Sequence, residues 1–405
     1  MTDTDHQAEQ HRLRRTTRHL ILSLAAVAVF GMAFAGVYVW TVDRQVPPQP
    51  TPPPAPTATT VPLQETLLIQ ATTADGAVGN LLAAVSTDAT SSVVFPLPAE
   101  LVVTGPQAAP EPLRLTVAGL DTLRSSNAVA ATLGVRVDAA WRIDRKALAG
   151  LVDSVDGLPV TVPESVRVRD EAGEVVATVR AGRQRLDGTT ASWYAVGTVP
   201  RQTAAEATSR FTDVMTGALR RLPRSDVAIR ESLTALGALA PSTIGTQELA
   251  VFLLDLSQSL TQEGATITEL ATTTTPVGEF EPEWLDYNRA TPQLRRTVPY
   301  ALWRTGVDGP ARVLVSAIQV RPGRLAQAST RISDAGFVFV DGRGTPVPSG
   351  QTRTTVTARG TRAPAMQVEA ALEIPDARTE VVPAGEPGRP WADVDVVLSG
   401  RSGEW

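Results

Sequence analysis

The chain has 405 residues, a net charge of −5 and no cysteine. The lack of cysteine excludes disulfides, thiol nucleophiles and thiolate metal sites, and the negative charge argues against nucleic acid as a partner. The three histidines, His6, His11 and His19, all precede residue 20. Beyond residue 40 this excludes a Ser-His-Asp triad, a histidine-ligated zinc ion and a histidine general base.

The first element along the chain is an uncharged apolar segment at residues 20–40. As a helix it would span about 30 Å, the thickness of a bilayer's hydrocarbon core. Arginines gather on its N-terminal side, so we expect residues 1–19 to be a cytoplasmic tail and the rest of the chain to be exported. The alternative is a signal peptide cleaved after Ala35. The apolar run continues past that point, which favours a single-pass anchor in the cell membrane.

Residues 41–63 form a linker rich in proline and threonine. Such a composition cannot build a core and favours an extended polyproline II conformation. We therefore predict a stalk that holds the following domain away from the membrane.

From residue 64 onward, short apolar runs alternate with helical patterns. Buried strands are predicted at residues 66–69, 92–95 and 158–162. Asp144 is a plausible N-cap for a helix with apolar residues at i, i+3, i+4 and i+7, and Gly157 follows as its stop. A second apolar helical stripe begins at Phe211. Strands that alternate with helices predict an α/β domain.

Three motifs in this region have a recognisable order: Leu-Gly-Val-Arg-Val-Asp at 133–138, the helix ending at Gly157, and Ala-Gly-Arg-Gln-Arg-Leu-Asp-Gly at 181–188 followed by Ala191 and Tyr194. Together they resemble the LytR-CpsA-Psr family, over residues 64–275. The resemblance implies a single-pass envelope protein of Gram-positive bacteria that moves glycopolymers from a polyprenyl-pyrophosphate carrier to peptidoglycan, usually with Mg²⁺. It also implies arginines for the pyrophosphate, carboxylates for the metal and an apolar tunnel for the lipid.

The chain departs from the family pattern at the positions of the family's catalytic arginines and aspartates. The family's Ile-Pro-Arg-Asp after its third strand is Leu-Pro-Ala-Glu at residues 97–100, and its aspartate near the preceding strand is replaced, with Asp75 three residues away. The uncharged replacements are Ala99, Val78, Val196 and Thr198. Each lost bidentate arginine contact removes about 1.5–3 kcal/mol. We therefore predict no catalytic residues, no metal ligands and no cofactor, and Mg²⁺ only if the chain is an active transferase.

Five charged residues remain as candidate ligand-binding residues: Arg183, Arg185, Arg201, Arg210 and Glu100. Arg210 begins the helix after the motif loop and matches a family arginine. For each arginine the competing interpretation is a solvated surface side chain.

The C-terminal part predicts a polar connector at residues 276–310 and a second, smaller α/β domain at 311–400. The connector's aromatic residues either pack across the domain boundary or form a binding patch. The second domain resembles the LytR C-terminal domain in its order of strands and helices. Asp393 and Asp395 alternate with valines, which predicts the outward face of a half-buried strand in preference to a metal site.

Three functions remain open. The leading hypothesis is a non-catalytic envelope protein that binds a polyprenyl-linked or wall glycopolymer, or another envelope protein. The alternative is an active phosphotransferase whose arginines stand at other positions. A sensor that signals to the cytoplasm is the weakest, because a tail of about 19 residues is too short for an effector domain.

Overall fold

The computed structural model describes residues 64–86, 91–104, 110–117, 122–262, 264–274, 281–321, 323–347, 351–383 and 390–400. The predicted tail, apolar segment and stalk lie outside these residues. In the described ranges, no helix has the length and apolar character needed to cross a membrane.

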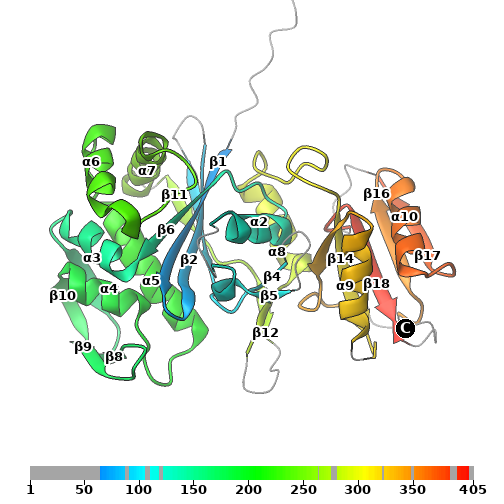
Figure 1. The fold of residues 1–405 in the computed structure, drawn as a ribbon, viewed down its shortest axis with the longest axis horizontal. Helices are drawn as coiled ribbons and strands as arrows, with labels where there is room; N and C mark the ends of the chain where they lie inside the picture. The colour runs from blue at the N-terminus through cyan, green and yellow to red at the C-terminus, as the bar shows by residue number, and fades with distance from the viewer. Residues whose placement is uncertain are drawn as a thin grey trace, which may run out of the picture. The chain divides into compact units, whose positions relative to one another are not determined.

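A five-stranded mixed sheet organises the N-terminal part (Figure 1), in the order β11-β3-β2-β1-β6. Its strands are β1 (Gln64–Thr73), β2 (Gly76–Ser86), β3 (Ser92–Leu97), β6 (Ala139–Asp144) and β11 (Ala265–Ile267). The first three form an antiparallel meander, and β6 runs parallel to β1. The ends of β1, β3 and β6 and the start of β2 therefore meet at one edge of the sheet.

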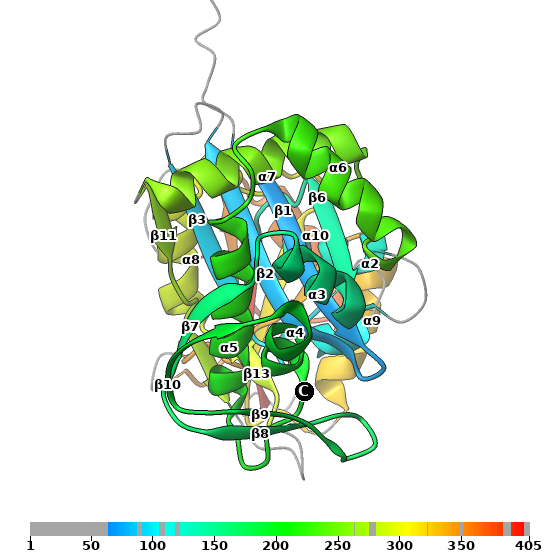
Figure 2. The same cartoon turned by 90° about the vertical axis from the view of Figure 1, so that its left-hand side faces the viewer.

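Helices cover both faces of this sheet. Figure 2 shows one face under α3 (Arg145–Asp153), α4 (Gly188–Val196), α5 (Ala204–Leu219), α6 (Asp226–Leu236) and α7 (Thr246–Thr261), whereas α2 (Thr122–Leu133) packs on the other. Successive side chains of a strand point to opposite faces. Leu67 and Ile69 accordingly enter the core under α3–α7, and Leu68 enters the core under α2. This arrangement confirms the predicted mixed α/β fold.

Short ribbons extend the helical face. They are β7 (Leu158–Val162) with β10 (Gly182–Leu186), and β8 (Val166–Arg169) with β9 (Val175–Val179). Elsewhere β4 (Val102–Val103) pairs with β5 (Glu111–Pro112), and β12 (Thr272–Thr274) pairs with β13 (Glu283–Leu285). Two 3₁₀ turns, η1 (Leu113–Leu115) and η2 (Gly237–Leu239), complete this part.

The start of α3 confirms the sequence prediction. The Asp144 carboxylate accepts a hydrogen bond from the Ala147 N–H at 2.7 Å, so it caps the helix. The helix ends at Asp153, earlier than predicted, and Gly157, with a φ of 74°, closes the turn that follows by donating its N–H to the Val152 carbonyl.

A second five-stranded sheet follows, in the order β15-β14-β18-β16-β17. Its strands are β14 (Arg312–Ile318), β15 (Val338–Asp341), β16 (Thr355–Arg359), β17 (Arg378–Val382) and β18 (Val394–Ser399), with helices α9 (Arg324–Asp334) and α10 (Ala363–Leu372). The predicted outward position of Asp395 is wrong. Strand β18 is central and wholly buried, and Asp395, 3% exposed, accepts hydrogen bonds from the Trp391 and Ala392 N–H groups.

The predicted connector contains β13 and helix α8 (Tyr287–Thr297). Two of its aromatic residues, Trp284 and Tyr287, are 3% and 1% exposed and therefore pack in the core, whereas Tyr300 is 45% exposed. Tyr287 belongs to the same core as Leu68 of the first sheet and Leu314 of the second. The domain boundaries on either side of the connector stay a prediction.

Candidate functional site

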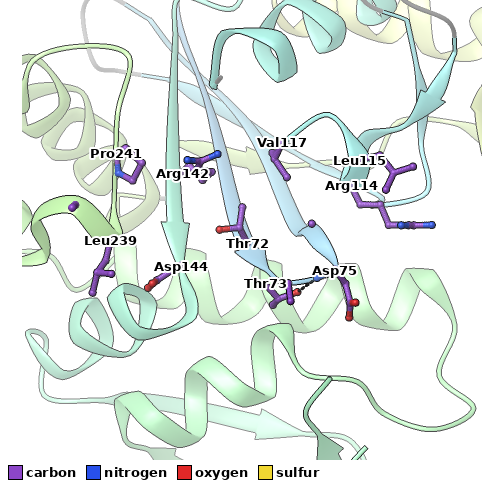
Figure 3. A pocket seen from close by; sticks show the side chains of 13 residues that line it. Thr72, Thr73, Asp75, Arg114, Leu115, Val117, Arg142, Asp144, Leu239 and Pro241 are labelled. Carbon is purple, nitrogen blue, oxygen red and sulfur yellow. Dashed lines mark hydrogen bonds between the residues drawn. The ribbon is translucent and has the colours of Figure 1, made fainter. Parts of the chain in front are cut away.

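A pocket of about 450 Å³ lies where β1 and β6 end (Figure 3). We call it the strand-end site. Its charged side chains are Asp75, Arg114, Arg142 and Asp144, and the hydroxyl groups of Thr72 and Thr73 also line it. Apolar side chains form the rest of the wall: Leu115, Val117, Leu239 and Pro241. The lining therefore includes two arginines and two carboxylates.

The β1–β2 turn fixes one side of the site. The Asp75 N–H donates to Thr73 Oγ1 at 3.2 Å. Gly76 has a φ of 109°, and a Cβ atom there would lie only 2.1 Å from the Arg114 carbonyl oxygen. The turn and residue 114 can approach this closely only because position 76 is glycine.

Arg114 contacts Ala99 and Glu100, two positions at which the chain departs from the family pattern. Its backbone N–H donates to the Ala99 carbonyl at 2.9 Å. Its side-chain Nε lies 2.6 Å from Oε1 of Glu100, and both side chains are about a quarter exposed. Glu100, a predicted binding residue, is therefore an ion-pair partner beside the strand-end site and does not line it.

Strand β6 supplies the other side. Arg142 and Asp144 are paired in register with Gln70 and Thr72 of β1. Asp144 caps α3. In the described ranges, no three acidic, histidine or cysteine side chains lie together in a way suited to a metal ion.

Arg210 does not line the strand-end site. It is 6% exposed, and its guanidinium donates to the carbonyls of Tyr194 and Gly197 and to Oε1 of Gln202. Burial lowers its pKa to about 10. These hydrogen bonds join Arg210 to the loop that follows Tyr194. With Arg201 it lines a second pocket, of about 650 Å³, which we call the α5 pocket.

The remaining predicted residues belong to neither pocket. Arg183 and Arg185 lie on β10 with exposed side chains, and Arg185 Nε donates to the Asp156 carbonyl at 2.7 Å. The structure thus brings Arg201 and Arg210 together but leaves Arg183, Arg185 and Glu100 apart from them.

Sequence reasoning missed Arg114 and Arg142. A signal for Arg142 was present, because it alternates with the apolar residues Trp141 and Ile143 near the end of a strand parallel to β1. Ligand sites in open α/β sheets favour such strand ends. Arg114 gives no such signal, because it reaches the site only through tertiary folding.

The layer between the first sheet and helices α3–α7 is filled by side chains. Trp141, Phe211 and Met215 are all fully buried there. A Cβ atom at Gly79 of β2 would lie 2.4 Å from the Phe211 ring, so helix α5 packs directly on the strand.

Residues 117–199 match the model of the LytR_cpsA_psr family. This part of the chain is similar to the LytR-CpsA-Psr family. The match includes strand β6 and the motifs around Tyr194. The resemblance that the sequence suggested is therefore confirmed, and with it a relationship to proteins of cell-wall glycopolymer chemistry.

Solved structures share the fold of this chain. Bacillus subtilis TagV is 12% identical, with a TM-score of 0.50, over 59% of this chain and 99% of TagV. A Streptococcus agalactiae protein is 15% identical, with a TM-score of 0.51, over 60% of this chain and 90% of its own. At these identities the likeness establishes the fold. No curated protein matches the chain by sequence.

Proposed function

We propose that this chain is a single-pass, extracytoplasmic envelope protein of the LytR-CpsA-Psr family, which binds a wall glycopolymer, or its polyprenyl-linked precursor, without transferring it. The observation that carries the proposal is the replacement of an arginine by Ala99 while Glu100 is held in an ion pair with Arg114. Residues 20–40 provide the anchor.

The charge of the strand-end site supports binding of a glycan over binding of a pyrophosphate. Asp75 and Asp144 oppose the two arginines, and Glu100 neutralises Arg114. A multiply charged phosphate needs an excess of positive donors. Hydroxyl groups of a sugar, by contrast, are matched by mixed carboxylates, arginines and threonines.

The packed interior supports the absence of transfer. A polyprenyl chain requires an apolar channel, and Phe211 and Trp141 fill the layer between sheet and helices. Opening that layer would expose apolar surface at about 25 cal/mol per Å².

The alternative, an active phosphotransferase, is favoured by one observation. Arg114 stands beside Ala99, and Arg142 lines the same pocket, so two arginines have reached the strand-end site from other positions. The strand-end site has as many carboxylates as arginines, so it has no excess of positive charge for a pyrophosphate. We therefore place this function second.

The test is a titration of the full-length chain in detergent micelles with a chitin tetrasaccharide, a soluble glycan without phosphate. We expect calorimetry to detect binding that Asp75→Ala and Arg142→Gln weaken at least tenfold, which is about 1.4 kcal/mol. The control is Glu231→Ala, on the exposed surface of α6 and in neither pocket. A chain that does not bind the glycan, or strand-end variants that bind as tightly as the parent, would refute the proposal.

A further inference from the structure

The α5 pocket lies between the end of β7, the loop after α4 and the first turns of α5, and shares no lining residue with the strand-end site. All of its lining belongs to the continuous range 122–262. Its volume of about 650 Å³ is in the usual range for small-ligand sites.

Helix α5 begins beside this pocket with a capping box. Thr203 Oγ1 accepts a hydrogen bond from the Glu206 N–H, and Glu206 accepts one from the Thr203 N–H. The residues that α5 presents to the pocket from there are Glu206, Ser209 and Asp213. Their spacing of three and four residues places them on one helix face.

Arg210 lines the pocket, but its guanidinium group already donates hydrogen bonds within the protein. Both terminal nitrogens donate to the loop, and its Cζ lies 5.4 Å from the centre of the Tyr194 ring. Its Nε is buried and has no hydrogen-bond partner among the described residues. The guanidinium that the family resemblance assigns to a phosphate is therefore used here to shape the pocket.

The remaining groups disfavour an anion. The carboxylates of Glu164, Glu206 and Asp213 line the pocket together with Arg201, Gln202 and Ser209. Three carboxylates repel phosphate. They accept hydrogen bonds from hydroxyl groups, while Gln202 and Arg201 can donate to hydroxyl oxygens.

Apolar walls complete the pocket. Pro163, Val166, Val199 and Pro200 line it beside the polar groups. A sugar ring presents apolar C–H faces and polar edges, which such a mixture of walls matches. We infer that the α5 pocket is a second saccharide subsite, which takes a neutral sugar unit and not a phosphate group. The inference rests on the proposed function, because it supplies a second contact for the same class of ligand.

The experiment is calorimetry of the full-length chain in detergent with the chitin tetrasaccharide, and with inorganic pyrophosphate as competitor. The variants are Ser209→Ala and Asp213→Ala, whose side chains are exposed on α5 and whose replacement suits a helix. We expect two binding events for the parent chain, and a loss of at least tenfold in the affinity of one of them in each variant. Glu231→Ala should leave both unchanged, and pyrophosphate should not compete at the α5 pocket.

The outcomes separate this inference from the proposed function. If Asp75→Ala weakens binding but the α5 variants do not, the inference is refuted and the proposed function remains. If the α5 variants bind like the parent and the strand-end variants do too, both are refuted. Competition by pyrophosphate that the α5 variants abolish would also overturn the inference, because it would make this pocket an anion site.

Discussion

Arg312 of β14 donates a hydrogen bond from Nη2 to the carbonyl oxygen of Thr132, at the end of helix α2, over 3.1 Å. Its Nε donates to the neighbouring Ala131 carbonyl. The Tyr287 hydroxyl donates to the same Thr132 oxygen at 2.8 Å. A cation from the second sheet thus satisfies the free carbonyls at the end of a helix that covers the first sheet.

We expect Arg312→Ala to lower the free energy of unfolding by about 3 kcal/mol, because it removes the side-chain donor of the buried Ala131 carbonyl and one of the two donors of the Thr132 carbonyl. Urea unfolding measures this difference. The matched control is Arg378→Ala, since Arg378 is exposed and pairs with the half-exposed Glu380, and it should change the stability by at most about 0.5 kcal/mol. Equal effects of the two changes would show that Arg312 does not tie α2 to the second sheet.

Gly76→Ala should disturb the strand-end site. The new Cβ would meet the Arg114 carbonyl at 2.1 Å in a left-handed backbone conformation. We expect a loss of about 2 kcal/mol or more in stability, together with weaker glycan binding. Gly173→Ala is the control, because its φ of 83° is equally strained but its Cβ would meet nothing within 4 Å. If the control costs as much, the close contact with residue 114 is not the cause.

Asp213 predicts a pH dependence of stability. Although its side chain is exposed, desolvation by the surrounding residues raises its pKa above the usual 3.8. The folded state then holds the proton more tightly than the unfolded state, so the ionised carboxylate reduces stability at neutral pH and this penalty disappears as the pH falls through the raised pKa. Asp213→Asn should therefore be more stable than the parent at pH 7, with a smaller difference below pH 4, by urea unfolding. An unchanged difference across this range would contradict the raised pKa.

The anchor predicts the length of the mature chain. Because the apolar segment at residues 20–40 continues past Ala35, we expect the protein in membranes to retain its N-terminus. Intact-mass spectrometry of the membrane fraction would measure this. A mature chain that begins at Gly36 would instead identify a cleaved signal peptide.

The sequence predicted those features that depend on local periodicity and capping. Asp144 caps the start of α3, Gly157 closes the turn after it, and the alternation of strands and helices predicts both sheets. Local patterns predicted the wrong burial where the position of a strand within its sheet determines which side chains are exposed. Asp395 has the spacing of an outward residue, yet β18 lies between two neighbours and its carboxylate binds backbone N–H groups.

The candidate site was less predictable than the fold, because its charges come from distant segments. Arg114 reaches Glu100 only after the chain returns through β5, and no spacing in the sequence marks that contact. Arg210 was predicted to bind a ligand. Its guanidinium donates to the Gly197 carbonyl, a contact that no spacing in the sequence marks. Its part in ligand binding stays a prediction.

The measurement that tests the central claim most directly is the release of polyprenyl monophosphate by the full-length chain from a polyprenyl-pyrophosphate-linked glycan, with Mg²⁺ and with peptidoglycan as acceptor. The account predicts that the rate equals the rate without protein, while the glycan still binds. Release above that background that is lost in Arg114→Gln or Arg142→Gln would contradict it, and would identify these two arginines as relocated members of an active transferase site.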